Sequence, residues 1–187
     1  MGEGAQQCAP SFFMEKKEGN FMKVLAFDQS SRCSGYAFFE NGEYVESGVI
    51  DMSKSKLGTY ERSFEMAREL WKVIKKYKPE HLIIEDTQQQ SNIKTVIILA
   101  RLQGIIIGYA EAHGVKVHIL LPSQWRSALS YSQGPKIKRA ELKQQSIDYV
   151  KEIFGLDVLD DEAEAIAEGV AAHKIYNFAN DDIWGED

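Results

Sequence analysis

The sequence predicts an α/β fold, with a five-stranded mixed sheet of three antiparallel and then parallel strands, flanked by helices. Three observations predict it. The chain of 187 residues with 44% hydrophobic content can build one sizeable core, short apolar runs alternate with longer amphipathic segments, and an Asn-Gly pair at residues 41–42 separates two short runs. Asn-Gly between such runs is a strong β-hairpin signal. The order βββαβαβαα implies an antiparallel meander joined to parallel strands by helical crossovers.

Five apolar runs have the length and composition of strands. They cover residues 23–28, 35–40, 43–50, 81–85 and 115–120. The second and third runs are joined by the Asn-Gly turn, so we expect them to pair as a hairpin. The fourth and fifth follow helical segments, which is typical of strands that pair in parallel.

Five segments are predicted to be helical. Their expected bounds, in chain order, are residues 59–78, 92–112, 122–125, 138–154 and 161–178. The first ends at a Lys-Pro step, because the residue before proline disfavours the helical conformation. Its apolar residues recur at helical spacing and predict an inner face made of Phe64, Ala67, Leu70, Trp71 and Ile74.

The chain is expected to form one folded domain with two flanking segments. Residues 1–21 show no periodicity and lack the apolar stretch of a signal peptide, which predicts a flexible N-terminal extension. Residues 22–178 contain all the predicted strands and helices and form the domain. Residues 179–187 are an acidic C-terminal tail.

Cysteine usage and hydropathy favour a cytoplasmic protein. Cys8 and Cys33 are the only two cysteines and form no CxxC pair, so neither a disulfide framework nor a cysteine-based zinc site is indicated. The longest apolar run, residues 95–110, contains Arg101 and Gln103 and falls short of the roughly 18 apolar residues that span a membrane. No membrane partner is expected.

Four carboxylates lie at the ends of three predicted elements. Asp28 and Glu85 end the first and fourth strands, and Asp161 and Glu164 open the last helix. Converging buried anions repel one another unless a cation or a proton intervenes. Hard oxygen ligands suit Mg²⁺ or Mn²⁺, and residues three apart share one helix face, so the helical pair can hold one ion together.

Simpler explanations fit each acid taken alone. The acids at 160–164 match an N-terminal cluster that stabilises the helix dipole, and Asp28 or Glu85 matches a strand-end carboxylate that caps a loop. Asp160 competes with Asp161 for the same role. Three further acids lie within one turn of a candidate, namely Asp86, Glu162 and Glu168.

Four motifs follow one another along the chain. They are Leu25-Ala26-Phe27-Asp28-Gln29-Ser30 with Gly35-Tyr36-Ala37, then Ile83-Ile84-Glu85-Asp86, then Ala100-Arg101-Leu102-Gln103-Gly104, and finally Asp161-Glu162-Ala163-Glu164-Ala165-Ile166-Ala167. This ordered set resembles the ribonuclease H-like (retroviral integrase) superfamily. Within it, the set is most similar to RuvC-type Holliday-junction resolvases, particularly the shorter bacteriophage branch. The likeness spans roughly residues 22–176.

The resemblance implies an endonuclease of DNA recombination and repair that uses two Mg²⁺ or Mn²⁺ ions. Asp28 would be shared by both ions, Glu85 would be the second strand ligand, and Asp161 and Glu164 the helical pair. One ion would activate a water for attack on phosphorus and the other would stabilise the departing 3′ oxygen, giving a 5′-phosphate and a 3′-hydroxyl. The family usually has Asp at the final position, so Glu164 is a departure.

The expected substrate is branched DNA. Resolvases of this kind often place an aromatic wedge just after the glutamate motif, whereas residues 86–90 are wholly polar here. We therefore expect activity on replication forks and three-way junctions as well as on four-way Holliday junctions. The bacteriophage likeness places the protein in the cytoplasm of a bacterial host.

A basic segment provides candidate phosphate contacts, although the net charge of the chain is −6. It contains Arg126, Lys136, Lys138, Arg139 and Lys143. Arg126 and Lys138 lie where similar resolvases carry basic residues, Lys136 competes with Lys138, and Lys143 fits a solvated helix face nearly as well. Trp125 could stack on a base, but a buried core position is the favoured interpretation.

Symmetric incision of a four-way junction needs two active sites related by a two-fold axis, so a homodimer is expected. The helix at 92–112 offers the interface, because its apolar residues cover more than one stripe, although other helices of the same chain could cover it. Two alternative functions remain. One is a non-catalytic module of the same fold that binds branched DNA, and the other is a fragment of an actin-like ATPase or kinase.

Overall fold

The computed structural model describes residues 22–87, 92–176 and 178. The predicted N-terminal extension, most of the polar loop after Asp86 and the acidic tail lie outside the described residues. The elements, in chain order, are β1 (Lys23–Asp28), β2 (Cys33–Glu40), β3 (Glu43–Asp51), α1 (Thr59–Tyr77), β4 (His81–Glu85), α2 (Ile93–Ala112), β5 (Lys116–Leu120), α3 (Pro122–Ala128), α4 (Arg139–Phe154) and α5 (Asp160–Ile175).

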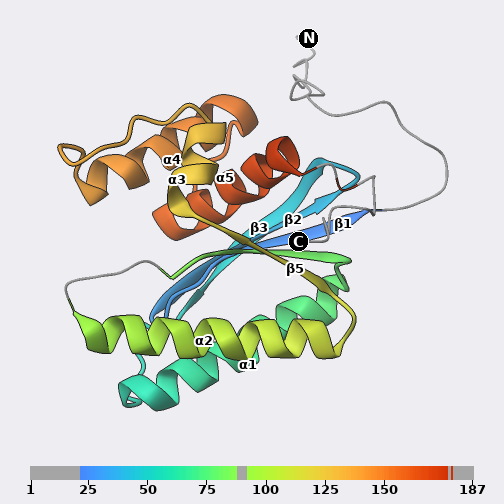
Figure 1. The fold of residues 1–187 in the computed structure, drawn as a ribbon, viewed down its shortest axis with the longest axis vertical. Helices are drawn as coiled ribbons and strands as arrows, with labels where there is room; N and C mark the ends of the chain where they lie inside the picture. The colour runs from blue at the N-terminus through green and yellow to red at the C-terminus, as the bar shows by residue number, and fades with distance from the viewer. Residues whose placement is uncertain (1–21, 88–91, 177, 179–187) are drawn as a thin grey trace, which may run out of the picture.

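The predicted mixed sheet is confirmed. Its strand order is β3-β2-β1-β4-β5, with β1, β2 and β3 antiparallel and β4 and β5 parallel to β1. The hairpin turns at Asn41 and Gly42, which both have the positive φ that such a turn requires. Figure 1 shows the sheet between two helical layers, with α1 and α2 on one face and α3, α4 and α5 on the other.

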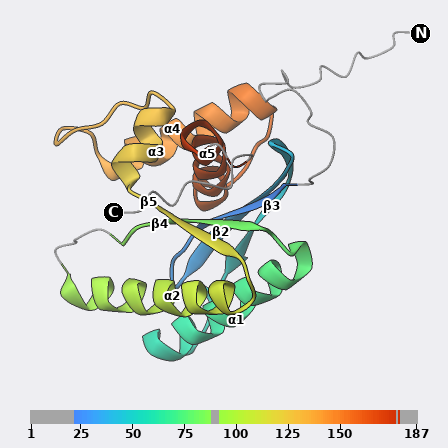
Figure 2. The ribbon, with the colours of Figure 1, turned by 45° about the vertical axis from the view of Figure 1, so that its right-hand side comes forward.

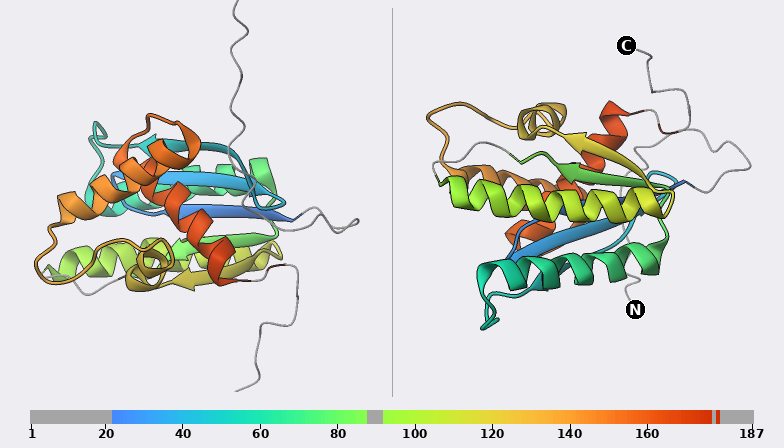
Figure 3. Two further views of the ribbon diagram at one scale, coloured as in Figure 1. Left: turned by 90° about the horizontal axis from the view of Figure 1, so that it is seen from above. Right: turned by 60° about the horizontal axis from the view of Figure 1, so that its bottom comes forward.

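Each face of the sheet has its own core, because successive strand residues point to opposite sides. Leu25 and Phe27 of β1 pack with Met66 and Leu70 of α1 and with residues of α2. The intervening β1 residues face α5 and α3, in a core that includes Val24, Ala26, Ile83, Trp125, Ile166 and Ala171. Figure 2 and the left view of Figure 3 show α5 crossing the sheet beneath α4.

Helix α5 lies very close to the sheet because glycines leave room for it. A Cβ added to Gly169 would lie 2.1 Å from the Phe39 ring, and one added to Gly35 would lie 1.9 Å from the Asp161 carbonyl oxygen. A side chain at either position would push α5 away from the sheet. Gly35 thus fixes the start of α5 against β2, which is the end that carries the candidate carboxylates.

Several predicted bounds and faces differ in the structure. Strand β2 begins two residues earlier than expected, α3 continues to Ala128, and α5 ends at Ile175 instead of residue 178. Phe64 was expected on the inner face of α1 but is 46% exposed, and Met66 takes an inner position instead. Both side chains fit an apolar helical stripe, and the crossing of α1 over the sheet selects between them.

Helix α2 is less buried than its composition predicts. Only Leu102, Gln103, Ile106 and Ala110 are buried, whereas Ile93 is 66% exposed. By length and composition alone α2 could cross a membrane, so the expectation that no run reaches this length is wrong. Helices that cover a sheet pass the same test, and α2 contributes core residues to the sheet face shared with α1 (Figure 3, right).

Candidate functional site

The ends of β1 and β4 bring two carboxylates to one edge of the sheet. Phe27 is paired with Ile84 in the parallel register, so Asp28 and Glu85 occupy the next position on each strand. Polar side chains at the carboxyl ends of adjacent parallel strands commonly form sites, because both chains leave the sheet there. Helix α5 begins over the same edge, as the contact between Gly35 and Asp161 requires.

Three of the predicted carboxylates form a compact cluster. Asp28, Asp161 and Glu164 each have a carboxylate oxygen within 4.8 Å of the others. Burial raises the pKa of Asp28, and repulsion from Glu164, Glu85 and Asp161 raises it further, while Lys143 lowers it. Because the cluster consists of hard oxygen donors that destabilise one another, it fits a divalent cation such as Mg²⁺ or Mn²⁺.

Glu85 lies beside this cluster in a different environment. Its Oε2 accepts a hydrogen bond of 2.7 Å from the Trp125 indole and lies 3.7 Å from Nη2 of Arg126. Burial raises the pKa of Glu85, and the hydrogen bond from Trp125 and the charges of Arg126 and Arg139 oppose that rise. Glu85 and Asp28 line the same pocket of about 300 Å³, which also contains Asp161.

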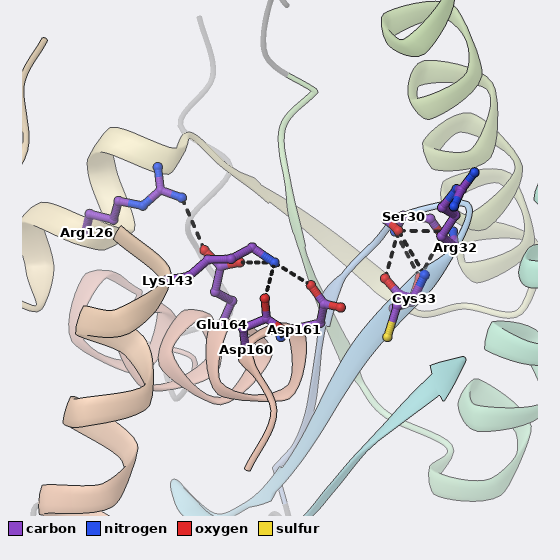
Figure 4. Close-up of polar contacts among 9 residues, drawn as sticks. Ser30, Arg32, Cys33, Arg126, Lys143, Asp160, Asp161 and Glu164 are labelled. Carbon is purple, nitrogen blue, oxygen red and sulfur yellow. Dashed lines mark hydrogen bonds and ion pairs between the residues drawn. The ribbon is translucent and has the colours of Figure 1, made fainter. Parts of the chain in front are cut away.

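Two basic side chains occupy the space among the acids (Figure 4). Lys143 Nζ lies 2.8 Å from Asp160, 2.8 Å from Asp161 and 3.7 Å from Glu164. Arg126 reaches Glu164 at 3.5 Å from the side of α3. Burial would lower the pKa of Lys143, but its hydrogen bonds to Asp160 and Asp161 raise that pKa above its usual range. Both cations offset the negative charge of these carboxylates, as a bound metal ion would.

The two acids that compete with Asp161 as a metal ligand lie in different surroundings from it. Asp161 belongs to the cluster, whereas Asp160 has a 44% exposed side chain and a pKa lowered by its hydrogen bond to Lys143. Glu162 turns away and accepts a 2.6 Å hydrogen bond from Ser47 on β3. The geometry therefore favours Asp161 over both of its neighbours as a metal ligand.

Glu168 is a buried carboxyl that the sequence offered only as a neighbour of Glu164. Its side chain is 1% exposed, and neither oxygen has a hydrogen-bond partner among the described residues. Burial raises the pKa of Glu168 well above its usual value, and the charges of Glu85, Asp28 and Glu164 add to the rise. Its position at i+4 from Glu164 was the available signal.

The opposite wall of the pocket is the turn between β1 and β2, shown at the right of Figure 4. Ser30 Oγ donates to the Cys33 carbonyl at 2.8 Å, and Ser34 Oγ donates to the Ser30 carbonyl at 2.9 Å. These hydroxyls stabilise the turn. Cys33 lines the pocket, and burial together with the hydrogen bond to Asp161 raises its pKa to about 12, so the thiol stays protonated.

The basic segment divides into inner and outer residues. Arg126 is inside, with a 15% exposed side chain in contact with two carboxylates, whereas Lys136, Lys138 and Arg139 are exposed near the start of α4. Arg139 also lines the pocket. Lys143 proves to be an inner residue. From the sequence, a solvated helix face was nearly as good an interpretation of Lys143 as a phosphate contact. Its spacing of one helical turn from Arg139 on α4 was the signal that could have placed it.

The sheet order and the acidic cluster define the class, a ribonuclease H-like protein with carboxylates at the ends of β1 and β4 and on a C-terminal helix. The sequence pattern of one family within this class, crossover junction endodeoxyribonuclease RuvC, matches residues 24–172. The chain therefore belongs to the RuvC family. This membership argues against the actin-like alternative.

Relatives and solved structures agree with this family. The chain is 28% identical to a RuvC of Syntrophomonas wolfei over 85% of this chain and 92% of that one, and 31% identical to a RuvC of Fusobacterium nucleatum over 78% and 77%. It superposes on T. thermophilus RuvC in complex with a Holliday junction substrate with a TM-score of 0.64 and 18% identity, over 82% of this chain and 93% of that one. It also superposes on the fowlpox virus resolvase in complex with Holliday junction DNA. The TM-score is 0.57 and the identity 17%, over 82% of this chain and 97% of that one.

Proposed function

We propose that the protein is a metal-dependent, structure-selective DNA endonuclease that hydrolyses phosphodiester bonds in Holliday junctions and other branched DNAs. The cluster of Asp28, Asp161 and Glu164 at one sheet edge carries this proposal, because such a donor set suits a divalent cation. Family membership supplies the substrate class, since relatives are named crossover junction endodeoxyribonucleases.

Asp28, Glu85, Asp161 and Glu164 would hold two Mg²⁺ or Mn²⁺ ions. When bound, such ions supply an activated water and stabilise the leaving 3′ oxygen, which gives 5′-phosphate and 3′-hydroxyl ends. Asp28 reaches the site from the central strand of the sheet and lies within 4.8 Å of both helical ligands, which supports the proposal that both ions would share it. Glu85 closes the site from β4.

Basic residues around the pocket would bind the DNA backbone. Arg139 lines the pocket next to the acids, and Lys136 and Lys138 are exposed immediately before it, so phosphates of an incoming strand would meet them first. Arg126 and Lys143 lie deeper, against Glu164. Because they contact the carboxylates, they would meet the phosphate at which cleavage occurs.

The segment after Glu85 favours relaxed junction selectivity. Asp86 and Thr87 line the pocket, and residues 88–90, which the structure does not describe, are glutamines. Amide side chains can hydrogen-bond exposed bases and phosphates but do not wedge between stacked pairs as an aromatic ring does. Forks and three-way junctions are therefore proposed substrates alongside four-way junctions. The bacterial relatives support the cytoplasm of a bacterial host as the place of action.

A homodimer would provide the two centres that paired incisions need. Helix α2 supports this proposal, because Ile93 is 66% and Ile97 39% exposed, and no helix of the described chain covers them. Exposed apolar side chains that follow one another along one helix are typical of association surfaces. The second copy would pack its own α2 there.

The experiment is a comparison of labelled four-way junction, fork and linear duplex, each incubated with the protein in Mg²⁺, in Mn²⁺ and in a chelator. We expect metal-dependent incision of the branched substrates and little cleavage of the duplex. Binding of the junction without incision in either metal would favour the alternative function, a non-catalytic module that binds branched DNA.

A further inference from the structure

The Trp125 indole combines full burial with a polar contact in the site. Trp125 is 0% exposed and belongs to the core between the sheet and α5. Its Nε1–H donates a 2.7 Å hydrogen bond to Glu85 Oε2 across forty residues of sequence. A core tryptophan needs only a partner for its N–H, and here the partner is a carboxylate proposed to bind metal.

The main chain of Glu85 is also held in place. Its carbonyl oxygen accepts hydrogen bonds from Gln29 Nε2 at 2.6 Å and from Gln103 Nε2 at 3.1 Å. The Thr87 hydroxyl donates to Gln103 Oε1 at 2.9 Å, which orients that amide. With the backbone fixed in this way, the direction of the carboxylate depends on what contacts its oxygens.

We propose that Trp125 is a positioning residue for Glu85, an inference that rests on the proposed metal site. The indole holds Oε2 and leaves Oε1 for a cation. Arg126 also approaches Oε2, but at 3.7 Å. The indole N–H is a donor without a formal charge, so it orients the carboxylate and leaves its negative charge available to a metal. An arginine or lysine at hydrogen-bonding distance would offset more of that charge than Arg126 does at 3.7 Å.

A hydrogen bond that orients a metal ligand has a measurable effect on metal affinity and on activity. Loss of a partner that orients a metal ligand typically costs about 10–100-fold in metal affinity or activity. Trp125→Phe removes the N–H and keeps an aromatic ring in the core. Trp71→Phe is the matched control, because the Trp71 indole stacks on Tyr109 and its buried Nε1 has no hydrogen-bond partner among the described residues.

The first test measures Mn²⁺ binding without DNA, by the electron paramagnetic resonance signal of the free ion, and then kcat and KM on a four-way junction. We expect Trp125→Phe to weaken Mn²⁺ binding and lower kcat by about 10–100-fold each. KM for DNA should stay unchanged, because Trp125 is buried and Trp125→Phe keeps an aromatic ring beneath the Arg126 guanidinium, which lies 4.6 Å from the indole centroid. Trp71→Phe should match the wild type. Wild-type Mn²⁺ affinity and kcat in Trp125→Phe would overturn the proposal.

The second test does not depend on how Trp125→Phe folds. In the metal-free protein, the indole N–H resonance of Trp125 should move when Glu85→Gln removes the carboxylate, while that of Trp71 stays in place. An unmoved Trp125 resonance would show that the contact is absent in solution. This outcome is distinct from failure of the proposed function, which would appear as binding of the four-way junction without incision by the wild-type protein in either metal, with the indole contact intact.

Discussion

Lys143 and Asp161 are joined by a 2.8 Å contact between Nζ and Oδ1, and the same ammonium lies 2.8 Å from Asp160. Lys143 is thus one of two cations among the described residues, with Arg126, that contact the acids of the site. The Lys143 ammonium contacts three carboxylates, since Glu164 lies at 3.7 Å, and Arg126 contacts Glu164 from the other side. The contact links α4 to the start of α5, so the stability of the domain and the charge of the site depend on the same side chain.

Lys143→Met is expected to destabilise the metal-free protein by about 1–3 kcal/mol, because hydrogen bonds to charged, part-buried carboxylates are lost and the repulsion between those carboxylates remains. Saturating Mg²⁺ should recover a larger share of stability in the variant than in the wild type. Urea unfolding with chelator and with Mg²⁺ measures both effects.

Lys151→Met is the control for this variant. Lys151 pairs with Asp157 on the same helical layer, but the two side chains are 54% and 83% exposed. Exposed ion pairs contribute at most about 1 kcal/mol, so Mg²⁺ should make no difference here. Equal, metal-independent losses in the two variants would contradict a special role of Lys143.

The buried carboxyl of Glu168 predicts that the metal-free protein loses stability as pH rises. Its pKa in the folded state is raised above 4.5, so its contribution is present below pH 4.5 and is lost as pH rises through the folded pKa. Each such group lowers the unfolding free energy by about 1.4 kcal/mol per pH unit in that window.

Glu168→Gln removes the titrating group, so urea unfolding from pH 4.5 upward should give a flatter profile. A slope equal to that of the wild type would contradict a raised pKa for the buried Glu168.

Gly35→Ala is expected to separate the helical ligands from Asp28. The new Cβ would lie 1.9 Å from the backbone oxygen of Asp161, and backbone cannot turn aside as a side chain does. We expect a loss of about 1–3 kcal/mol in stability together with impaired cleavage.

Gly104→Ala is the control for Gly35→Ala, because nothing lies within 4 Å of its added Cβ, and it should stabilise α2 by about 0.5–1 kcal/mol. Normal cleavage by Gly35→Ala would show that α5 tolerates the shift.

Ile97→Glu should weaken the proposed homodimer. A charge introduced at the exposed apolar face of α2 must be desolvated at the interface, so the dimer dissociation constant should rise about 30-fold or more. Sedimentation velocity over a concentration series measures this constant. Val45→Glu, at another exposed apolar residue on β3, should leave it unchanged. A wild-type protein that stays monomeric at all concentrations would refute the interface.

The sequence predicted the fold well where a pattern has one structural solution. Apolar runs and the Asn-Gly turn defined the strands, and strand-end positions brought Asp28 and Glu85 together as expected. The spacing of Asp161 and Glu164 placed them on one helix face, and both lie in the cluster with Asp28. These features depend on backbone periodicity, which sequence displays directly.

Other features depend on tertiary packing and could not be predicted. Phe64 and Met66 fit the same stripe until the crossing of α1 is known, and α2 is apolar on a side that the described chain leaves exposed. Lys143 and Trp125 reach the acids because of how α3 and α4 pack on α5. Periodicity gives the face on which a side chain lies, but not its partner across the fold.

The account depends most directly on Asp28, so the decisive measurement is cleavage of a labelled four-way junction by Asp28→Asn in Mg²⁺. The substitution keeps the size of the side chain but removes the charge that a shared ligand supplies. Glu162→Gln, which changes a neighbouring acid that faces Ser47, is the control. We predict that Asp28→Asn binds the junction but does not cut it, while Glu162→Gln cuts normally. Cleavage by Asp28→Asn at the wild-type rate would contradict the proposed site.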